Sequence, residues 1–394
     1  MKNCERKNIL LLFGGMGAEH KVSVMSAEAL FGELSELDYR IIPIYIEKSG
    51  AWLASRDRNL SPIGLCRTVS EACDKGSNRA DGKSCDKNFC RADGKSCDKS
   101  FCRADGGGFG YGSSLTDGGI CEVFPTRRSG GACIEICGEL TKIDAAIPAL
   151  HGDFGEDGCV QGALLTVGIP FVGCDVGCGA LCADKSVSKL IAESLGIKTV
   201  DSLTVYGDRC EAMKRIKAAL PYPVFIKPTD LGSSLGASCA ECDEELAGAL
   251  KAALSLSRCA LAEKFVKGAR ELECAFFEHK GKQYFTNVGE IRHSGRFYGY
   301  GEKYESSATE LALPTDLSRS VTERIRSAAE HLVTRLGCRH LSRLDFFLGE
   351  DGELYFNEIN TMPGLTSASM FPYLARTEGF SLRELFSDFI EQIC

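Results

Sequence analysis

The chain has 394 residues, 44% hydrophobic and 25% charged, which is ordinary for a globular protein of two or three domains. Its net charge of −8 argues against a nucleic-acid partner, and no apolar run approaches the roughly 18 residues that a membrane helix needs. The N-terminal apolar stretch is too short for a signal peptide, so we expect a cytoplasmic protein with no membrane partner. The 21 cysteines are odd in number and scattered, which favours small buried thiols over a disulfide framework.

The first elements in chain order are a strand over 8–13, a helical pattern within 18–34, and a strand over 40–46. This β-α-β order predicts the opening of a parallel sheet. The turn between the first strand and the helix, GGMGAEHKVS, departs from the dinucleotide fingerprint because His20 stands where the last glycine belongs. The turn instead places Glu19 at a helix N-terminus, where its carboxylate is a candidate for binding a substrate ammonium group.

Between about 70 and 119 the composition changes to Gly, Asp, Ser, Lys and Cys, with almost no aliphatic residues. Within it the unit RADGKSCDKNFC occurs twice, with Ser100 in the second copy where the first has Asn88. Such a segment cannot bury enough apolar surface to fold alone, so we expect a disordered surface insertion. Two alternatives stay open, namely a partner-binding role and a metal site formed by Cys85, Cys90, Cys97 and Cys102.

Patterned sequence resumes near 121, and a buried strand over 143–150 leads into HGDFGEDG and a helix over 157–168. His151 thus follows the C-terminal edge of a strand, where α/β sheets place ligands, although a structural role is equally open. The next expected elements are helices over 175–195, a strand over 222–228 and a helix over 243–254.

The strand that ends near 228 delivers Lys227 into the loop KPTDLGSSLGAS. The N–H groups and hydroxyls of such a Gly/Ser loop suit a phosphate, although a plain turn is the alternative. The sequence contains no Walker-type phosphate loop, which disfavours that class of nucleotide hydrolase.

Strand patterns dominate after 258, interrupted by a helix over 318–336, and end in the strands 341–348 and 354–359. A tight GEDG turn joins the last two strands and brings Asp345 beside Glu358 and Asn360, whose side chains share one face. Three oxygen donors favour Mg²⁺ over zinc, whereas the alternative is a solvated polar face. Arg343 points the same way as Asp345, and its charge suits a developing oxyanion.

The segment FYGYGEKYESS, at 297–307, is rich in Gly and Tyr and carries Lys303. It suggests a mobile lid over a site, with an ordinary exposed loop as the alternative. Taken in order, the elements predict an α/β region at the front of the chain and a larger α+β region behind it.

Six segments, in this order, resemble the D-alanine–D-alanine ligases of the ATP-grasp superfamily. They are GGMGAEHKVS, LHGDFGEDGCVQG, the Asp-Lys pair at 184–185, KPTDLGSSLG, the EKY of the lid segment, and RLD…NEINTMPGLTSAS. The resemblance runs from residue 8 to about 390, apart from the insertion. It implies a homodimer and a chain of three domains with the ATP-grasp fold. The domains are an N-terminal parallel-sheet substrate domain over 1–173, a central domain over 174–263 and a C-terminal domain over 264–394. The C-terminal domain carries the lid at 292–311.

The resemblance also implies where ATP, metal and substrates bind. The residues expected to contact ATP are Lys185, Lys227, Ser233, Ser234, Glu263, Phe265, Glu271 and Lys303. Among these, Glu263 and Glu271 would bracket the adenosine and Phe265 would stack near its base. Two Mg²⁺ ions, with Mn²⁺ as an alternative, would be held by Asp345, Glu358 and Asn360. The expected substrate contacts are Glu19, His151, Arg343 and Ser369, and the expected catalytic residues are Glu19, Ser233, Tyr304, Arg343 and Gly364.

The implied reaction is the ATP-dependent ligation of two D-alanines to D-alanyl-D-alanine, through a D-alanyl phosphate, for peptidoglycan precursors. No sequence feature identifies the base for the second amine. Tyr304 in the lid and Met370 after Ser369 favour D-alanine as the second substrate, with D-lactate and D-serine as alternatives. The rivals from other classes are a non-catalytic metal-responsive binding protein built on the cysteine repeat, and a dinucleotide-dependent dehydrogenase.

Overall fold

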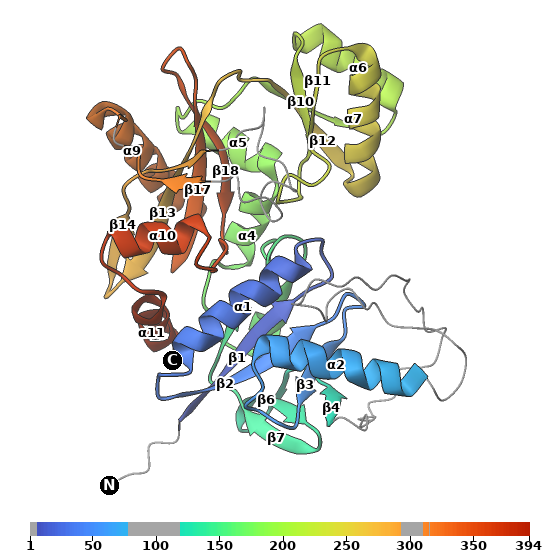
Figure 1. Ribbon diagram of the computed structural model, residues 1–394, viewed down its shortest axis with the longest axis vertical. Coiled ribbons are helices and arrows are strands. Elements are labelled where there is room, and N and C mark those ends of the chain that lie inside the picture. The colour runs from blue at the N-terminus through green and yellow to red at the C-terminus, as the bar shows by residue number, and fades with distance from the viewer. Residues whose placement is uncertain (1–5, 78–118, 293–309, 315) are drawn as a thin grey trace.

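The computed structural model describes residues 6–77, 119–292, 310–314 and 316–394. The cysteine repeat lies outside these residues, and so do Lys303 and Tyr304 of the expected lid. Figure 1 shows three groups of strands along the longest axis of the molecule, each with helices packed beside it. No helix of the described part is long and apolar enough to cross a bilayer.

The N-terminal part is built on a five-stranded sheet of order β4-β3-β2-β1-β8. Its centre is parallel, as the β-α-β pattern predicts, because β2 and β8 both run alongside β1 in the same direction. The five strands are β1 (Lys7–Gly14), β2 (Tyr39–Ile46), β3 (Trp52–Ser55), β4 (Ile120–Glu122) and β8 (Ala145–Pro148). A small antiparallel sheet lies beside them and consists of β5 (Thr126–Arg128), β6 (Gly131–Ile136) and β7 (Glu139–Lys142).

Helices accompany the N-terminal sheet, namely α1 (His20–Leu34), α2 (Pro62–Ser77) and α3 (Cys159–Val167). The inner face of α1 buries Val24, Ala27, Leu30 and Leu34, at the spacing of a helix with one apolar side. The last helix of the chain, α11 (Leu382–Ile393), packs against α1, so the C-terminus returns to the N-terminal sheet (Figure 1). This contact closes one hydrophobic core over segments more than 350 residues apart in the sequence.

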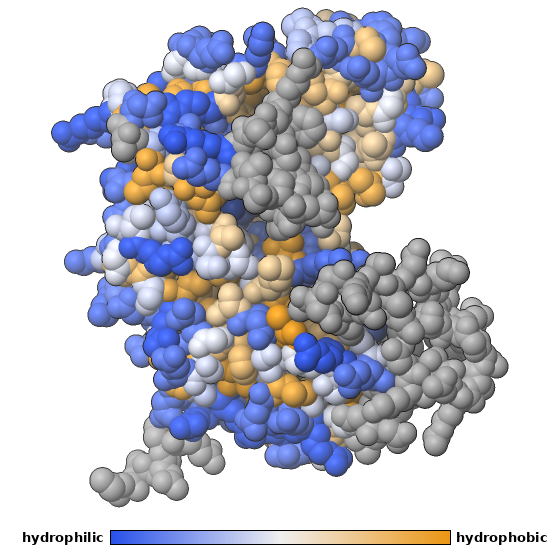
Figure 2. All heavy atoms as spheres, in the orientation of Figure 1, coloured by the Kyte–Doolittle hydropathy of each residue, from blue (hydrophilic) through white to orange (hydrophobic). Residues whose placement is uncertain are grey.

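The second sheet is antiparallel, of order β11-β10-β12-β9, and lies at the top of Figure 1 with two helices. Its elements are β9 (Ser202–Tyr206), α6 (Arg209–Ala219), β10 (Val224–Pro228), β11 (Ser238–Ala240), α7 (Asp243–Leu256) and β12 (Cys259–Lys264). The helices bury their apolar sides against the sheet. Hydrophilic residues gather at the upper right of Figure 2, over these helices, as expected for their outer faces.

The third sheet is also antiparallel and has the order β16-β15-β13-β17-β18, with β14 paired to β13. Its strands are β13 (Arg270–His279), β14 (Lys282–Phe285), β15 (Gly289–Arg292), β16 (Glu310–Ala312), β17 (Leu341–Leu348) and β18 (Leu354–Asn360). Both β14 and β15 pair with β13, at different parts of its length, and Thr286 between them exchanges hydrogen bonds with Ala275 of β13. The helix α9 (Arg319–Leu336) ends at Gly337, as the sequence predicts.

Three shorter helices connect these sheets, namely α4 (Val176–Ala183), α5 (Lys185–Ser194) and α10 (Met370–Thr377). Both α4 and α5 pack against β18, so their apolar sides share a core with the third sheet. The sequence places these two helices in a central domain over 174–263, and the domain boundaries stay a prediction. The mixture of a parallel-centred α/β region and antiparallel α+β regions agrees with the expected fold class.

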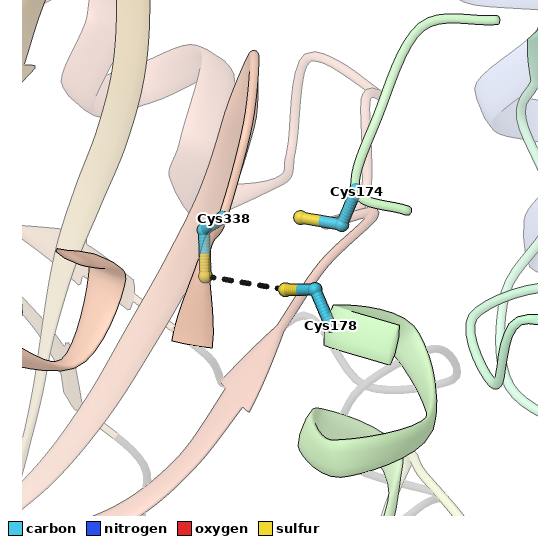
Figure 3. A group of neighbouring side chains, drawn as sticks. All are labelled: Cys174, Cys178 and Cys338. Carbon is cyan, nitrogen blue, oxygen red and sulfur yellow. Dashed lines mark hydrogen bonds between the residues drawn. The ribbon is translucent and has the colours of Figure 1, made fainter. Parts of the chain in front are cut away.

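All the cysteines whose side chains the structure describes are free thiols, and about half of them are buried. The buried ones are Cys66, Cys121, Cys133, Cys174, Cys178, Cys182, Cys274 and Cys338. Three of these, Cys174, Cys178 and Cys338, point toward one another from separate segments (Figure 3).

Candidate active site

A cavity of about 1200 Å³ lies between the second and third sheets. Its walls contain most of the residues expected to bind ATP and metal, namely Lys185, Lys227, Ser233, Ser234, Glu263, Phe265, Glu271, Asp345 and Glu358. These side chains come from α5, the two sheets and the Gly/Ser loop, so the fold brings together residues that are up to 173 positions apart in the sequence, from 185 to 358.

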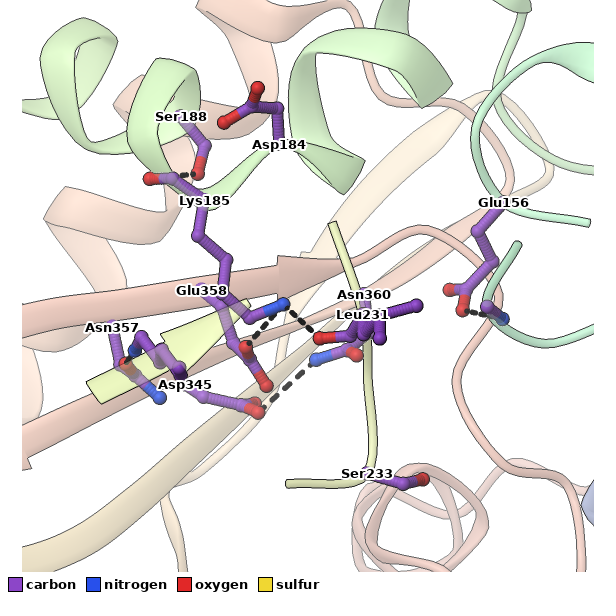
Figure 4. A network of polar contacts seen from close by, with 12 residues as sticks. Glu156, Asp184, Lys185, Ser188, Leu231, Ser233, Asp345, Asn357, Glu358 and Asn360 are labelled. Carbon is purple, nitrogen blue, oxygen red and sulfur yellow. Dashed lines mark hydrogen bonds and ion pairs between the residues drawn. The ribbon is translucent and has the colours of Figure 1, made fainter. Parts of the chain in front are cut away.

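The β17–β18 hairpin presents the expected oxygen donors side by side. Asp345 lies opposite Glu358 and Arg343 lies opposite Asn360 in the antiparallel register, and Asn360 Nδ2 donates to Asp345 Oδ2 at 3.1 Å (Figure 4). The register shifts after Asp345, so Phe346 pairs with Phe356 and the residue at 357 is additional. Because of this bulge Asn357 also reaches the cavity, a position that strict alternation along the strand does not predict.

Two carboxylates and amide oxygens form a donor set of oxygen atoms only. Hard cations such as Mg²⁺ prefer such ligands, whereas zinc prefers sulfur and nitrogen. The half-buried Asp345 and Glu358 open onto a cavity large enough for a nucleotide, and the residues present therefore fit a divalent metal bound together with phosphate oxygens.

Arg343 is held by two carboxylates. Its guanidinium donates to both oxygens of Asp345 at 2.8 and 2.7 Å, and its Nε lies 2.9 Å from Glu273 Oε2. Burial by itself would lower the pKa of Arg343, but Asp345 and Glu273 hold it well above its usual value. The side chain is thus a fixed positive charge beside the candidate metal site, and Glu273, which fixes it, is absent from the residues that the sequence singles out.

Two lysines reach the same region from different elements. Lys185 is the first residue of α5, and the side chain of the N-cap residue Asp184 accepts from two backbone N–H groups of that helix. The ammonium group of Lys185 donates to Leu231 O at 2.6 Å and lies 3.4 Å from Glu358 (Figure 4). Lys227, at the end of β10, donates to Asn357 at 3.0 Å and forms a 2.8 Å ion pair with Glu263. Both charges therefore lie between the Gly/Ser loop and the hairpin.

Glu263 contacts lysines. The residue is 97% buried, and its carboxylate forms 2.8 Å ion pairs with Lys189 and with Lys227. Burial would raise the pKa of Glu263, but the two ammonium groups outweigh it and lower the pKa to about 2. This geometry favours a role in positioning Lys227 over the expected hydrogen bond to adenosine. Like Asn357 and Glu273, Lys189 is a residue that the sequence analysis did not identify.

The Gly/Ser loop meets the N-terminal part at Glu19. Ser233 Oγ donates to the Glu19 carboxylate, and both Ser233 and Ser234 adopt positive φ angles of 50° and 57°. The loop passes so close to Glu19 that a Cβ atom on Gly232 would lie 2.5 Å from its Oε2. The structure thus brings together Glu19 and Ser233, two of the residues expected to be catalytic.

His151 is fixed by the protein on both sides of its ring. Its Nε2 is 2.8 Å from Ser26 Oγ, and its Nδ1 is 2.8 Å from the carbonyl oxygen of Met362. Burial is the main reason that the pKa of His151 is lowered, so the ring is neutral at pH 7. The structural alternative for His151 fits these contacts better than the expected direct contact with a substrate.

Glu156 lies in the HGDFGEDG segment that follows β8, and the sequence alone predicts no role for it. Its carboxylate accepts from the backbone N–H groups of Gly152 at 2.9 Å and Met362 at 3.0 Å, which join the N-terminal part to the loop after β18. Burial and then the nearby Glu19 raise the pKa of Glu156 to about 7. Its side chain lies between two loops that carry expected site residues, a long-range contact with no signature in sequence spacing.

Gly364 and Ser369 lie next to each other, since a Cβ atom on Gly364 would be 2.7 Å from Ser369 Oγ. Ser369 is the N-cap of α10, and its hydroxyl is 2.9 Å from Thr366 Oγ1. Met370 is 98% buried in the core shared by α10 and α11, so its position adds no support to the argument from Met370 for the second substrate, which stays a prediction. Its sulfur packs where Gly289 leaves space.

Models of the two parts of a known family match almost the whole chain. The "D-ala D-ala ligase N-terminus" model covers residues 8–174 and the "D-ala D-ala ligase C-terminus" model covers residues 191–391. The chain is 35% identical to the D-alanine–D-alanine ligase of Acetivibrio thermocellus, over 98% of this chain and 96% of that one. It is 32% identical to the ligase of Chlorobaculum tepidum, over 96% and 94%.

Solved structures agree in fold. The VanG D-Ala:D-Ser ligase from Enterococcus faecalis is 29% identical, with a TM-score of 0.75 over 99% of this chain and 100% of that one. The D-alanyl-alanine synthetase A from Vibrio cholerae is 25% identical, with a TM-score of 0.75 over 99% and 98%. These structures carry the ATP-grasp architecture that the sequence motifs predict. The chain is therefore a ligase that uses ATP, and it belongs to the D-alanine–D-alanine ligase family.

Proposed function

We propose that this chain joins two D-alanines to D-alanyl-D-alanine for peptidoglycan precursors, with a D-alanyl phosphate as the intermediate. The observation that carries the proposal is the single cavity in which Lys185, Lys227 and the Gly/Ser loop face the Asp345–Glu358 pair. Glu19 meets the same loop through Ser233, so a nucleotide site and a candidate ammonium site share one boundary.

In the first step, a carboxylate oxygen of one D-alanine attacks the γ-phosphorus of ATP, the bond to the β,γ-bridging oxygen breaks, and ADP leaves. Phosphoryl transfer depends mainly on positioning and on offsetting negative charge. Lys185 and Lys227 offset that charge, and the loop N–H groups around Ser233 and Ser234 orient the γ-phosphate. The two Mg²⁺ ions, or Mn²⁺, that Asp345, Glu358 and Asn360 would hold supply further positive charge at the phosphate oxygens when bound.

In the second step, the amine of the second D-alanine attacks the acyl carbon, and the tetrahedral intermediate loses phosphate. The fixed charge of Arg343 and the N–H of Gly364 are assigned to the developing oxyanion. Ser369 stands at the N-terminus of α10, where the helix dipole favours the carboxylate of the second substrate. Phe265 and Glu271 line the part of the cavity assigned to the adenosine.

D-serine is the second candidate for the acceptor, because the chain resembles a D-Ala:D-Ser ligase over nearly its whole length. A competition experiment distinguishes the acceptors. The purified chain is incubated with ATP, Mg²⁺ and equal concentrations of D-alanine, D-serine and D-lactate, and the products are identified by mass. We expect D-alanyl-D-alanine to dominate. A dominant D-alanyl-D-serine or D-alanyl-D-lactate product would refute the acceptor assignment while leaving the ligase chemistry in place.

Hydroxylamine tests the proposed intermediate separately. Added together with ATP and D-alanine, it should trap the acyl phosphate as D-alanyl hydroxamate, detected by mass. Dipeptide formation without any trapped hydroxamate, at hydroxylamine concentrations that leave the enzyme active, would contradict a D-alanyl phosphate that is accessible to small nucleophiles. The cytoplasmic location, expected from the N-terminal sequence, and the homodimer, expected from the family resemblance, stay predictions. Light scattering of the purified chain tests the homodimer.

The Gly232→Ala substitution tests the contact between the Gly/Ser loop and Glu19. The new methyl group would lie 2.5 Å from Glu19 Oε2, so the carboxylate must move from its place beside Ser233. We expect kcat/KM for D-alanine to fall by about tenfold to a hundredfold, since displacements of about 1 Å at a reacting site have effects of this size. Steady-state kinetics with ADP detection measures this.

Gly248→Ala is the matched control for that variant. Gly248 lies inside α7, and a Cβ atom there meets nothing within 4 Å. This change should leave kinetics unaltered and raise helix stability by about 0.5–1 kcal/mol. Equal kinetic constants for Gly232→Ala and the unchanged chain would show that the Glu19 position is unimportant for the reaction.

A further inference from the structure

A group of buried cysteine sulfurs lies outside the ATP cavity. Cys174, Cys178, Cys182 and Cys338 are each at least 96% buried and belong to the core shared by α4, α9 and the third sheet. Figure 3 shows Cys338, which lies between the end of α9 and the start of β17, pointing toward Cys178 of α4 and Cys174 just before that helix. None of the four lines the cavity between the second and third sheets.

Local structure explains how these sulfurs converge. Cys174 precedes the N-cap Asp175, whose side chain accepts from Cys178 N at 2.9 Å. Cys178 and Cys182 are four residues apart, which places both on the buried face of α4. Cys338 directly follows Gly337, whose φ of 72° ends α9 and turns the chain back toward α4.

The separations of three of these sulfurs match those of a thiolate metal site, and Cys182 adds a sulfur beside Cys178. The ligand atoms of Cys174, Cys178 and Cys338 all lie within 4.8 Å of one another, and no other such group of His, Cys, Asp or Glu occurs among the described residues. Cys178 Sγ is 3.6 Å from Cys338 Sγ and 3.8 Å from Cys182 Sγ. In a tetrahedral site with Zn–S bonds of about 2.3 Å, neighbouring sulfurs are about 3.8 Å apart.

Isolated buried cysteines pack as small hydrophobic residues, and Cys274 in the same core illustrates this role. Its sulfur contacts the carbonyl oxygens of Ala275 and Thr286. In the four-cysteine group Cys174 Sγ also contacts a carbonyl oxygen, that of Arg339 at 3.8 Å, but here sulfurs face sulfurs as well, and the backbone N–H of Arg339 is directed at Cys174 Sγ at 3.5 Å. A donor aimed at a sulfur stabilises a thiolate, which is the form that binds metal.

We propose that Cys174, Cys178 and Cys338 form a buried structural site for zinc or a similar thiophilic divalent ion, with Cys182, whose Sγ lies 3.8 Å from that of Cys178, as the fourth ligand. Binding replaces the thiol protons, which are released to solvent. The ion would link α4 to the end of α9, across 160 residues of sequence between Cys178 and Cys338. Because α5 follows α4 directly and begins with Lys185, the site would also fix the helix pair that carries a candidate ATP ligand.

The test uses the full chain with Cys85, Cys90, Cys97 and Cys102 of the repeat changed to serine, so that the repeat cannot supply thiolates. The protein is purified with zinc and reductant and its metal content is measured by mass spectrometry. It is then stripped with a chelator and titrated with Cd²⁺, which reports thiolate binding through an ultraviolet charge-transfer band. We expect one zinc per chain, and a cadmium band that saturates at one equivalent.

The variants Cys178→Ala and Cys338→Ala should each weaken cadmium binding by more than about a hundredfold, since losing a ligand exceeds the effect of losing an outer contact. Cys274 is a buried cysteine of the same core, so the Cys274→Ala variant should bind cadmium as tightly as the chain that carries only the four serine substitutions in the repeat. Circular dichroism monitors folding of every protein. A folded background chain that binds neither ion, or equal binding by Cys178→Ala and Cys274→Ala, would overturn the proposal.

Discussion

Replacing Glu358 with glutamine is expected to reduce kcat for D-alanine-dependent ADP release by about a hundredfold or more. The change keeps the size of the side chain but removes one negative charge from the pair with Asp345, which lies directly opposite across the hairpin. A metal at phosphoryl transfer contributes several kcal/mol, and about 3 kcal/mol corresponds to this factor. Kinetics at saturating ATP and D-alanine with increasing Mg²⁺ should also show weaker metal activation.

Glu353→Gln is the matched control, because Glu353 precedes the same strand but its side chain is 39% exposed and pairs with Lys198 at the surface. It should leave both kcat and the Mg²⁺ dependence unchanged. Lys185 retains its bond to Leu231 O when Glu358 is altered, so the fold should survive the substitution. A Glu358→Gln enzyme with normal kcat and normal Mg²⁺ dependence would show that this carboxylate does not hold the metal.

Glu263→Gln is expected to destabilise the chain by about 3–5 kcal/mol, the usual consequence of removing one partner from a buried ion pair. The substitution leaves the ammonium groups of Lys189 and Lys227 without their shared carboxylate, in a region where Glu263 and Lys189 are almost fully buried. Urea unfolding at pH 7 measures the loss. ATP binding should weaken as well, because Lys227 would no longer be held in place.

The size of this effect depends on pH in a defined direction. The folded pKa of Glu263, about 2, lies below the value of about 4.3 for an unperturbed glutamate. Its stabilising effect is therefore complete above about pH 4.3 and is lost as pH falls through about 2. The difference in stability between the unchanged chain and Glu263→Gln should be largest near pH 7 and shrink toward pH 3.

Two comparisons make the Glu263 prediction specific. Glu353→Gln, which breaks a surface ion pair, should cost at most about 1 kcal/mol. The double variant Lys189→Met/Glu263→Gln should recover part of the lost stability, because an apolar side chain replaces a buried unpaired charge. If Glu263→Gln is as stable as Glu353→Gln, the buried lysine–glutamate cluster does not hold the site together.

Local sequence pattern predicted the parts of the site that depend on neighbouring residues. The GEDG turn and the two-residue spacing of Glu358 and Asn360 were enough to predict that Asp345 would meet them across a hairpin. The bulge after Asp345 was not predictable, because it adds a residue within a strand without a glycine or proline to mark it. Asn357 was missed for that reason.

Contacts between distant segments could not be predicted from spacing. Lys189 lies on the buried face of α5 and forms an ion pair with Glu263. Nothing in the local sequence distinguishes it from other lysines in helices. Glu156 and Met362 are 206 residues apart, and Cys178 and Cys338 are 160 apart. Among scattered cysteines, nothing in the chain order distinguished those that converge from those that pack singly.

The most direct test of the central claim measures ADP release by the purified chain with ATP and Mg²⁺, with and without D-alanine, and identifies the product by mass. The account predicts ADP release that depends on D-alanine, with one D-alanyl-D-alanine formed for each ADP. ADP release by the folded chain that is the same with and without D-alanine, or no dipeptide at saturating substrates, would contradict it.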